Sequence, residues 1–348
     1  MSLEGAKPTL RDVASLAGVS TMTVSRVLHD ASKVSPVARQ RVLAAVATCG
    51  YRPNELARSL RRRNGTGLIG LLVPDLSRNH CSRLAVGVEE QASRHRLRVI
   101  VSSTGQSEAK EKTLVDELLG RRVDGIIAVP SGGGQQHLVA AVDADMPVVL
   151  AERPPEGFTT DCVLVDGFSG ARDATLSLLL RGHHRIGLLT TAVAEHMGVE
   201  SLRGYMAVMN SANLPTGDLV RRYPKTPGEA ERAAAGLLAL LEPPTALLCS
   251  DPVATASALR AVQHRGMKTD IVGFLDSELA ADLPISAVTY DAEELGRAAC
   301  RFLVDRMQDR KDSIASSSTR TAPRPPCRLL VPTRLLLNAA WSGGGSPL

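Results

Sequence analysis

The chain of 348 residues is long enough for two or three domains, and its 44% apolar and 22% charged residues are ordinary values for globular proteins. This composition excludes a mostly disordered or collagen-like chain, and no apolar run approaches the roughly 18 residues that a membrane span needs. Residues 1–66 hold 11 Lys or Arg against 4 Asp or Glu, a formal charge of +7, whereas the remaining 30 basic and 32 acidic side chains give −2. The positive excess therefore lies in the first fifth of the chain and predicts a polyanion as the partner of that segment.

This basic segment has the pattern of three short helices. Thr9 and Asp12 have the spacing of a capping box, which begins a first helix, and Gly18 permits a tight turn after it. A second helix is expected over 21–28, and a third begins after Ser35. Two short helices joined by a turn that contains glycine form a helix-turn-helix, whose second helix enters the major groove of DNA.

Two stretches of the segment resemble a known family. Residues 9–28 (TLRDVA…AGVSTMTVSRVL) are similar to the DNA-binding headpiece of the lactose-repressor (LacI/GalR) family, and residues 50–60 are similar to its hinge helix. The match has no gaps, and family patterns recur as far as Leu337. The resemblance implies a sequence-specific DNA-binding transcriptional regulator, and a repressor in particular.

The resemblance also assigns DNA contacts to the second helix and to the hinge helix. Arg26 can donate two hydrogen bonds to a guanine edge, while the apolar Met22 suits a thymine methyl group or simple groove filling. Leu60 stands where the family inserts a leucine into the minor groove, which kinks the DNA. The implied DNA-contacting residues are Thr21, Met22, Thr23, Ser25, Arg26, Asn54, Ala57, Arg58, Leu60 and Arg61.

Interpretations that do not involve DNA stay open for these residues. The three helices could form a protein-binding module, Leu60 could be an ordinary helix-packing residue, and Arg61–Arg63 could be a solvated linker. A hinge segment that begins at Asn54 is too short to be helical alone. We therefore expect it to become ordered when DNA and a second subunit are present.

After residue 66 the pattern changes to short apolar strands that alternate with helices. Continuous apolar strands of this kind form parallel sheets that helices cover on both faces. Because a single sheet of all these strands would be large, two smaller sheets are expected, with a ligand cleft where the carboxyl ends of their strands face each other. The expected strands are 67–74, 98–102, 125–129, 148–151, 163–165, 186–190, 219–222, 246–249, 271–274, 287–289 and 328–337, and the expected helices are 81–95, 108–119, 135–142, 171–181, 202–212, 228–241 and 253–265.

The resemblance implies a small all-α helix-turn-helix headpiece followed by an α/β effector region of two periplasmic-binding-protein-like lobes. The expected boundaries are 1–53 for the headpiece, 54–66 for the hinge helix and linker, 67–341 for the two-lobed effector-binding and dimerisation region, and 342–348 for a flexible tail. Lobe 1 is expected to contain residues 67–162 and 290–327, and lobe 2 residues 163–289 and 328–341. The chain would cross between the lobes near 162–166, near 288–290 and in the Pro-rich stretch 321–327.

Sequence patterns of enzymes and metal sites do not hold in this chain. Residues 65–70 fit G-x-G-x-x-G, but they precede a strand and open no helix, so they cannot cradle a phosphate. His183 and His184 lack further ligands at a useful spacing. The sequence contains no Walker loop, no H-E-x-x-H and no G-x-S-x-G. We therefore expect no catalytic residue, no metal site and no cofactor.

The family's ligand contacts fall mainly on residues that follow the predicted strands. A cleft ligand needs hydrogen-bonding side chains at strand ends and an apolar surface to lie against. Two of the implied residues have another interpretation, because Asp251 could serve only as a helix cap and His80 could be a plain surface or interlobe histidine. The implied effector-binding residues are Asp75, His80, Arg153, Ser201, Arg203, Asp251, Asp276 and Tyr290.

The cleft departs from the family's pattern in three places. Ser201 stands where many members carry an effector-binding Arg, Leu275 replaces the first acid of a common Asp pair, and residues 79–81 replace Pro and aromatic positions. With aromatic residues at only 3%, planes on which a sugar could stack are scarce. Either the ligand is atypical for the family, or the cleft has lost control by a ligand.

The expected function is that of a homodimer on palindromic double-stranded operator DNA, because one headpiece covers only a half-site. A small molecule, such as a sugar or a related metabolite, would change the affinity for DNA. Six scattered cysteines indicate reduced thiols and a cytoplasmic protein, associated with the nucleoid when DNA-bound and without a membrane partner. The alternatives are a secreted two-lobed solute-binding protein and an enzyme, neither of which would show salt-dependent DNA binding.

Overall fold

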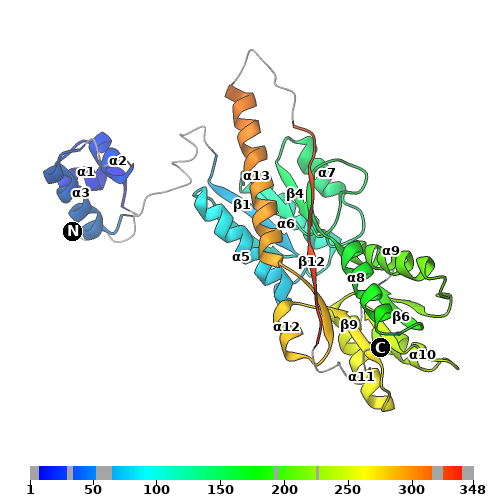
Figure 1. The fold of residues 1–348 in the computed structure, drawn as a ribbon. Coiled ribbons are helices and arrows are strands. Elements are labelled where there is room, and N and C mark those ends of the chain that lie inside the picture. Colours follow the sequence, from blue (N-terminus) through cyan, green and yellow to red (C-terminus); the bar gives the residue numbers. More distant parts are fainter. Residues whose placement is uncertain are drawn as a thin grey trace. The chain divides into compact units, whose positions relative to one another are not determined.

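Figure 1 shows the fold in a computed structural model, which describes residues 8–29, 34–51, 65–191, 195–224, 227–315 and 324–338. The chain divides into two compact units, residues 1–66 and 67–348. The expected fold class, a helical headpiece followed by two α/β lobes with parallel sheets, is confirmed. Within the described ranges, no helix is both long enough and apolar enough to cross a membrane. The tail predicted for 342–348 lies outside the described residues.

Three short helices make up the described part of the first unit. Asp12 N donates to Thr9 Oγ1 at 3.4 Å and Thr9 N donates to Asp12 Oδ2 at 2.7 Å, so the capping box expected from the sequence is present. Gly18 has a φ of 63°, a left-handed conformation that turns the chain sharply between the first two helices. The helices are α1 (Leu10–Ala17), α2 (Thr21–His29) and α3 (Pro36–Cys49).

The core of the headpiece is small and takes residues from all three helices. Val13, Val24 and Val42 are fully buried, one from each helix. Burying such side chains stabilises a fold by about 1.5–3 kcal/mol each, so this short segment has enough apolar contact to hold its helices together. The outer face of α2 is thereby left to solvent.

Two six-stranded sheets form the second unit. In the first sheet the strand order is β11-β5-β4-β3-β1-β2, and all neighbours are parallel. In the second the order is β12-β10-β9-β8-β6-β7, and only β12 is antiparallel to its neighbour. The strands of the first sheet are β1 (Leu68–Val73), β2 (Arg98–Ser103), β3 (Gly125–Ala128), β4 (Val148–Ala151), β5 (Asp161–Val165) and β11 (Arg328–Val331). Those of the second are β6 (Ile186–Thr191), β7 (Val220–Tyr223), β8 (Ala246–Cys249), β9 (Asp270–Phe274), β10 (Ser286–Tyr290) and β12 (Thr333–Leu336).

Helices cover both faces of each sheet, as continuous apolar strands require. In lobe 1, α5 and α13 pack on one face and α6 and α7 on the other. In lobe 2, α8 and α9 pack on one face and α10 and α11 on the other. The helices are α5 (Asn79–Arg94), α6 (Glu108–Gly120), α7 (Gln136–Asp143), α8 (Gly167–Leu180), α9 (His196–Ser211), α10 (Pro227–Leu238), α11 (Pro252–Arg265), the short α12 (Ser277–Asp282) and α13 (Ala292–Ala315).

The structure corrects the lobe boundaries near the end of the chain. Residues 163–165 and 328–331, which we expected in lobe 2, belong to the first sheet, where β11 pairs with β5. The third crossing between the lobes lies at Pro332 and not in the stretch 321–327. The sequence 328–337 looks like one strand, but proline has no N–H for a ladder, so the strand ends there and continues as β12 in the other sheet.

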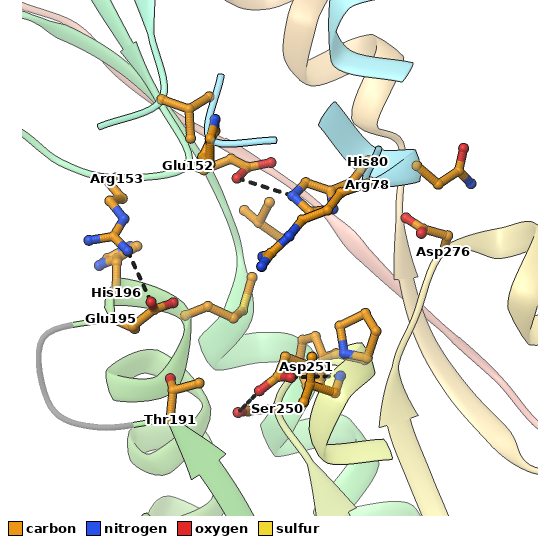
Figure 2. Close-up of a pocket in the computed structure, with 18 of the residues that line it drawn as sticks. Arg78, His80, Glu152, Arg153, Thr191, Glu195, His196, Ser250, Asp251 and Asp276 are labelled. Carbon is orange, nitrogen blue, oxygen red and sulfur yellow. Dashed lines mark hydrogen bonds and ion pairs between the residues drawn. The ribbon is translucent and has the colours of Figure 1, made fainter. Parts of the chain in front are cut away.

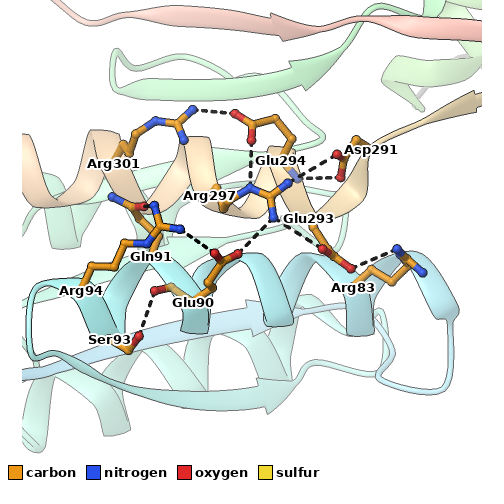
Figure 3. A network of polar contacts seen from close by, with 10 residues as sticks. All are labelled: Arg83, Glu90, Gln91, Ser93, Arg94, Asp291, Glu293, Glu294, Arg297 and Arg301. Carbon is orange, nitrogen blue, oxygen red and sulfur yellow. Dashed lines mark hydrogen bonds and ion pairs between the residues drawn. The ribbon is translucent and has the colours of Figure 1, made fainter.

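Helix α13 is the largest element that sequence analysis missed, because we assigned no helix to the residues after β10. It runs for 24 residues, with charged side chains on the outside and apolar ones on the sheet. A Cβ atom on Gly296 would lie 2.1 Å from the Leu84 carbonyl oxygen, and one on Gly87 would lie 2.0 Å from that of Glu293. The two glycines therefore let α5 and α13 lie directly against each other (Figure 3).

A buried ion pair fixes the edge of the first sheet. Arg306 of α13 donates to both Asp161 carboxylate oxygens, at 2.6 and 2.7 Å, and Asp161 also accepts from Cys327 N at 2.7 Å. The two side chains are 21% and 4% exposed. These contacts join α13, β5 and the start of β11, three segments that are far apart in the sequence.

We expect Arg306→Met to lower the free energy of unfolding by about 3 kcal/mol, because it leaves the buried Asp161 carboxylate without its cation. The matched control is Arg310→Met, which removes the exposed contact with Asp145 and is expected to cost less than about 1 kcal/mol. Urea unfolding followed by circular dichroism measures both. Equal losses in the two variants would contradict the role given to Arg306.

Candidate functional site

Helix α2 exposes the residues predicted to read bases. The side chains of Thr21, Met22 and Arg26 are exposed, and Met22 keeps 63% of its surface accessible. Thr23 and Ser25 are half-buried beside them. An exposed apolar side chain next to an exposed arginine suits contacts with base edges in a groove.

The headpiece also offers free positive charge. Within the described part of the headpiece, no carboxylate pairs with Arg11, Arg26, Arg39 or Arg41. Unpaired guanidinium groups are available to phosphate oxygens. The predicted hinge contacts Asn54, Ala57, Arg58, Leu60 and Arg61 lie outside the described residues.

A cavity of about 440 Å³ lies where the two lobes face each other. The parallel strands reach it with their carboxyl ends, since Pro74 follows β1, Glu152 follows β4 and Ser250 follows β8. Figure 2 shows the polar side chains that both lobes contribute. The polar lining residues are Ser77, Arg78, Asn79, His80, Gln106, Ser131, Glu152, Arg153, Thr191, Glu195, His196, Ser250, Asp251, Asp276 and Tyr290.

Five of the eight residues predicted to bind an effector line this cavity, namely His80, Arg153, Asp251, Asp276 and Tyr290. They come from α5, from the ends of β4, β8, β9 and β10, and thus from both lobes. The rule that ligands bind at the carboxyl ends of parallel strands accounts for four of them. Their roles toward a ligand stay predictions.

The other three, Asp75, Ser201 and Arg203, lie outside the cavity for local reasons. The Asp75 carboxylate accepts from N and Oγ of Ser77, at 2.9 and 2.7 Å. Ser201 is fully buried on the packed face of α9. Arg203 is exposed on another face of that helix and donates to Glu200 at 2.8 Å. None of the three side chains points to the space between the lobes.

Arg153 and Glu195 meet across the cavity, one from each lobe. Arg153 Nη2 donates to Glu195 Oε1 at 3.1 Å, and the side chains are only 17% and 22% exposed. Glu195 stands at the start of α9, where the positive end of the helix dipole favours a carboxylate. Sequence analysis found Arg153 and missed its partner.

The Asp251 carboxylate is occupied by the protein itself. Its Oδ1 accepts from the backbone N of Val253 and Ala254, at 2.8 and 3.0 Å, which caps α11. Its Oδ2 accepts from the Tyr223 hydroxyl at 2.6 Å, and burial together with this carboxylate raises the pKa of Tyr223. The structure thus supports the helix-cap interpretation, with Asp251 forming part of the cavity wall.

An acidic corner, made of Glu152, Asp276 and Tyr290, surrounds His80. Glu152 Oε2 lies 3.8 Å from His80 Nε2, and among the described residues its buried Oε1 has no hydrogen-bond partner. Burial raises the pKa of Asp276, and burial together with the charge of Glu152 raises that of Tyr290. A buried acceptor without a partner, such as Glu152 Oε1 among the described residues, suits a ligand with hydroxyl or amino groups.

Several lining residues were missed by sequence analysis. Thr191 ends β6 and Ser250 follows β8, so the strand-end rule could have found both. Burial lowers the pKa of His196, which begins α9. In the described chain, its Nε2 has no hydrogen-bond partner. No pattern in the sequence distinguishes this histidine from the surface histidines nearby.

The lining of the cavity combines hydrogen-bonding and apolar side chains. Arg78 and Asn79 offer donors, Glu152 and Asp276 offer acceptors, and apolar residues such as Met197 complete the lining. Nowhere in the described ranges do three His, Cys, Asp or Glu side chains group in a way that could hold a metal ion.

Comparison with known proteins decides the family. Residues 9–54 match the family described as "Bacterial regulatory proteins, lacI family", and residues 176–334 match the "Periplasmic binding protein-like domain". Catabolite control protein A of Priestia megaterium is 30% identical over 317 residues, which cover 89% of this chain and 95% of that protein. The chain belongs to the lacI family. It is therefore a DNA-binding transcriptional regulator and not an enzyme.

Solved structures of similar proteins agree with this assignment. A complex of the transcriptional regulator CelR with cellobiose is 27% identical, with a TM-score of 0.69, and covers 95% of this chain and 98% of the other. The Lac repressor dimer bound to operator and the anti-inducer ONPF has a TM-score of 0.80 over the same shares, at 24% identity, and shows the fold. The lacI-family chain thus has headpiece and both lobes in common with these proteins.

We expect His196→Gln to reduce the loss of stability of this lacI-family regulator between pH 7.5 and 5.5. The folded-state pKa of His196 is lowered from 6.5, so the unfolded chain takes up a proton that the folded chain resists, and stability falls as pH falls. Urea unfolding at both pH values measures the loss. The control is His184→Gln, at an exposed position, and its free energy of unfolding should fall between the two pH values as much as that of the wild type. If the free energy of unfolding of His196→Gln also fell by the wild-type amount, His196 would not cause the pH dependence.

Proposed function

We propose that this lacI-family regulator represses transcription by binding a pseudo-palindromic operator as a homodimer. We further propose that a small molecule in the interlobe cavity changes its affinity for that DNA. The observation that carries the proposal is the exposed row Thr21, Met22 and Arg26 on α2. Arg11, Arg26, Arg39 and Arg41 of the same unit pair with no carboxylate among the described residues.

The row on α2 supports recognition of bases in the major groove. Arg26 is long enough to donate two hydrogen bonds to a guanine, which discriminates against other bases by about 1–3 kcal/mol. Met22 offers a methyl-sized apolar surface, and Thr23 and Ser25 offer hydroxyl groups to phosphates. Binding of this kind combines sequence selection with a steep dependence on salt.

Residues 54–66 act as a hinge helix and linker in this proposal. Leu60, with Ala57 beside it, enters the minor groove and kinks the DNA, while Arg58 and Arg61 contact phosphates. Asn54 begins the segment. These assignments rest on the sequence, and the headpiece then spans residues 1–53.

The twofold symmetry of a palindromic operator supports a dimer of the protein. One helix-turn-helix reads a half-site of a few base pairs, and two related headpieces read the two halves of a palindrome. A closed homodimer is also the commonest form of a symmetric oligomer. We place its action in the cytoplasm, at the nucleoid when the operator is bound.

The interlobe cavity supports control by a polar metabolite. The CelR complex holds the sugar cellobiose, and the cavity here offers donors and acceptors, among them Asn79, Gln106 and Glu152. A ligand alters DNA affinity only if it binds two arrangements of the lobes with different affinity. We therefore propose a sugar or related small molecule that changes the closure of the two lobes.

Selection from a random DNA pool at near-physiological salt tests the proposal. We expect the wild type to enrich a palindrome, and Arg26→Ala to bind that palindrome about 10–100-fold more weakly, because the bidentate contact with guanine is lost. Arg232→Ala, an exposed arginine of α10, is the control and should select the same sequence as the wild type.

Filter binding over a salt series completes the test. The affinity for the selected palindrome should fall steeply and linearly with the logarithm of salt concentration. Sequence-blind binding by the wild type, or an unchanged palindrome with Arg26→Ala, would contradict specific recognition by α2. Absence of DNA binding at low salt would overturn the proposal as a whole.

A further inference from the structure

Opposite charges face each other across the cleft between the lobes. Lobe 1 contributes Arg83 on α5 and Arg153 after β4, while lobe 2 contributes Glu195 at the start of α9 and Glu278 in the first turn of α12. Arg83 is paired with Glu278, and Arg153 is paired with Glu195. The two lobes therefore attract each other through side chains of the chain itself.

The pair Arg153–Glu195 is the stronger of the two contacts. Its Nη2–Oε1 distance is 3.1 Å, and about four-fifths of each side chain is buried (Figure 2). Partial burial weakens screening by water and salt, so such a pair contributes more than one on the surface. Glu195 stands at the N-terminus of α9, where the helix dipole favours a carboxylate but does not itself attract Arg153.

The pair Arg83–Glu278 supports closure more weakly. Glu278 is 66% exposed, and exposed ion pairs have small effects. Two neighbours hold the contact in place, because Arg83 also pairs with Glu293 of its own lobe at 3.0 Å (Figure 3), and Asn79 Nδ2 donates to Glu278 at 3.5 Å. Separation of the lobes at this side would break the contacts with Glu278 and keep the one with Glu293.

We propose that Arg153 and Glu195 form an electrostatic clasp that holds the two lobes closed, with Arg83 and Glu278 as a weaker second contact. The clasp closes the cleft through the chain's own charges, so closure does not require a ligand. It also makes closure sensitive to salt. This inference concerns the lobes only and does not depend on whether the chain binds DNA.

The distance between spin labels on the two lobes measures closure in the full chain. Cysteines replace the exposed Glu117 of α6 and Gln263 of α11, in a background where Cys49 and Cys327 are serine. Labelled chain is diluted with unlabelled chain, so that only distances within one chain are observed. Arg153→Glu and Glu195→Arg should each lower the ratio of closed to open lobes about tenfold, a typical coupling for two residues in direct contact.

Four comparisons separate the clasp from other causes. The double variant Arg153→Glu with Glu195→Arg should restore the closed distance. Raising NaCl from about 50 to about 500 mM should shift the wild type toward the open distance. Glu195→Gln gives a milder test if a reversed charge prevents folding. Arg232→Glu, which breaks an exposed pair with Glu229 inside lobe 2, is the matched control and should not change the distance.

The result expected is therefore opening by each single variant, closure by the double variant and no effect of the control. An unchanged distance in Arg153→Glu, Glu195→Arg and Glu195→Gln would overturn the proposal. Opening by the single variants without recovery in the double variant would also overturn it, because the two residues would then act separately. DNA binding measured on the same variants reports on the proposed function independently.

Discussion

Parallel pairing of the strands is the constraint on which the second unit depends. A parallel neighbour requires a crossover, usually a helix, so the carboxyl ends of the strands collect at one edge of each sheet. Those edges face each other across the cavity, which brings together residues that follow β1, β4, β6 and β8. Helices α9 and α11 begin at the same edge, and their N-termini favour the carboxylates of Glu195 and Asp251.

The three crossings between the lobes limit how the lobes can move. The chain crosses after β5, after β10 and at Pro332, and neighbouring crossings are hydrogen-bonded, with Asp166 N donating to Val331 O at 2.9 Å and Thr333 Oγ1 to Asp166 O at 3.3 Å. Connections held side by side permit rotation about them more readily than separation. A single ion pair between the lobes, like Arg153–Glu195, can therefore shift the balance between two arrangements.

The headpiece and most strands could be predicted from the sequence because they depend on residues that are close together in the chain. The capping box at Thr9, the left-handed turn at Gly18 and the apolar runs of the strands depend on residues close in sequence. The place of β11 depends instead on pairing with β5, and helix α13 on packing against α5 through Gly87 and Gly296. Sequence periodicity carries no information about such distant partners, so both were missed.

The difference between local and distant causes also explains why only some of the predicted cleft residues line the cavity. A family resemblance transfers positions, but the chemistry at a position depends on the side chain and its neighbours. At position 201 a short serine stays within the packed face of α9, while Arg203 turns outward to Glu200. The cleft has its cationic groups instead from Arg78 and from Arg153, whose partner Glu195 belongs to the other lobe. We therefore expect a ligand of this cavity to be recognised by Arg153 and the acidic corner around His80, and not by a side chain at position 201.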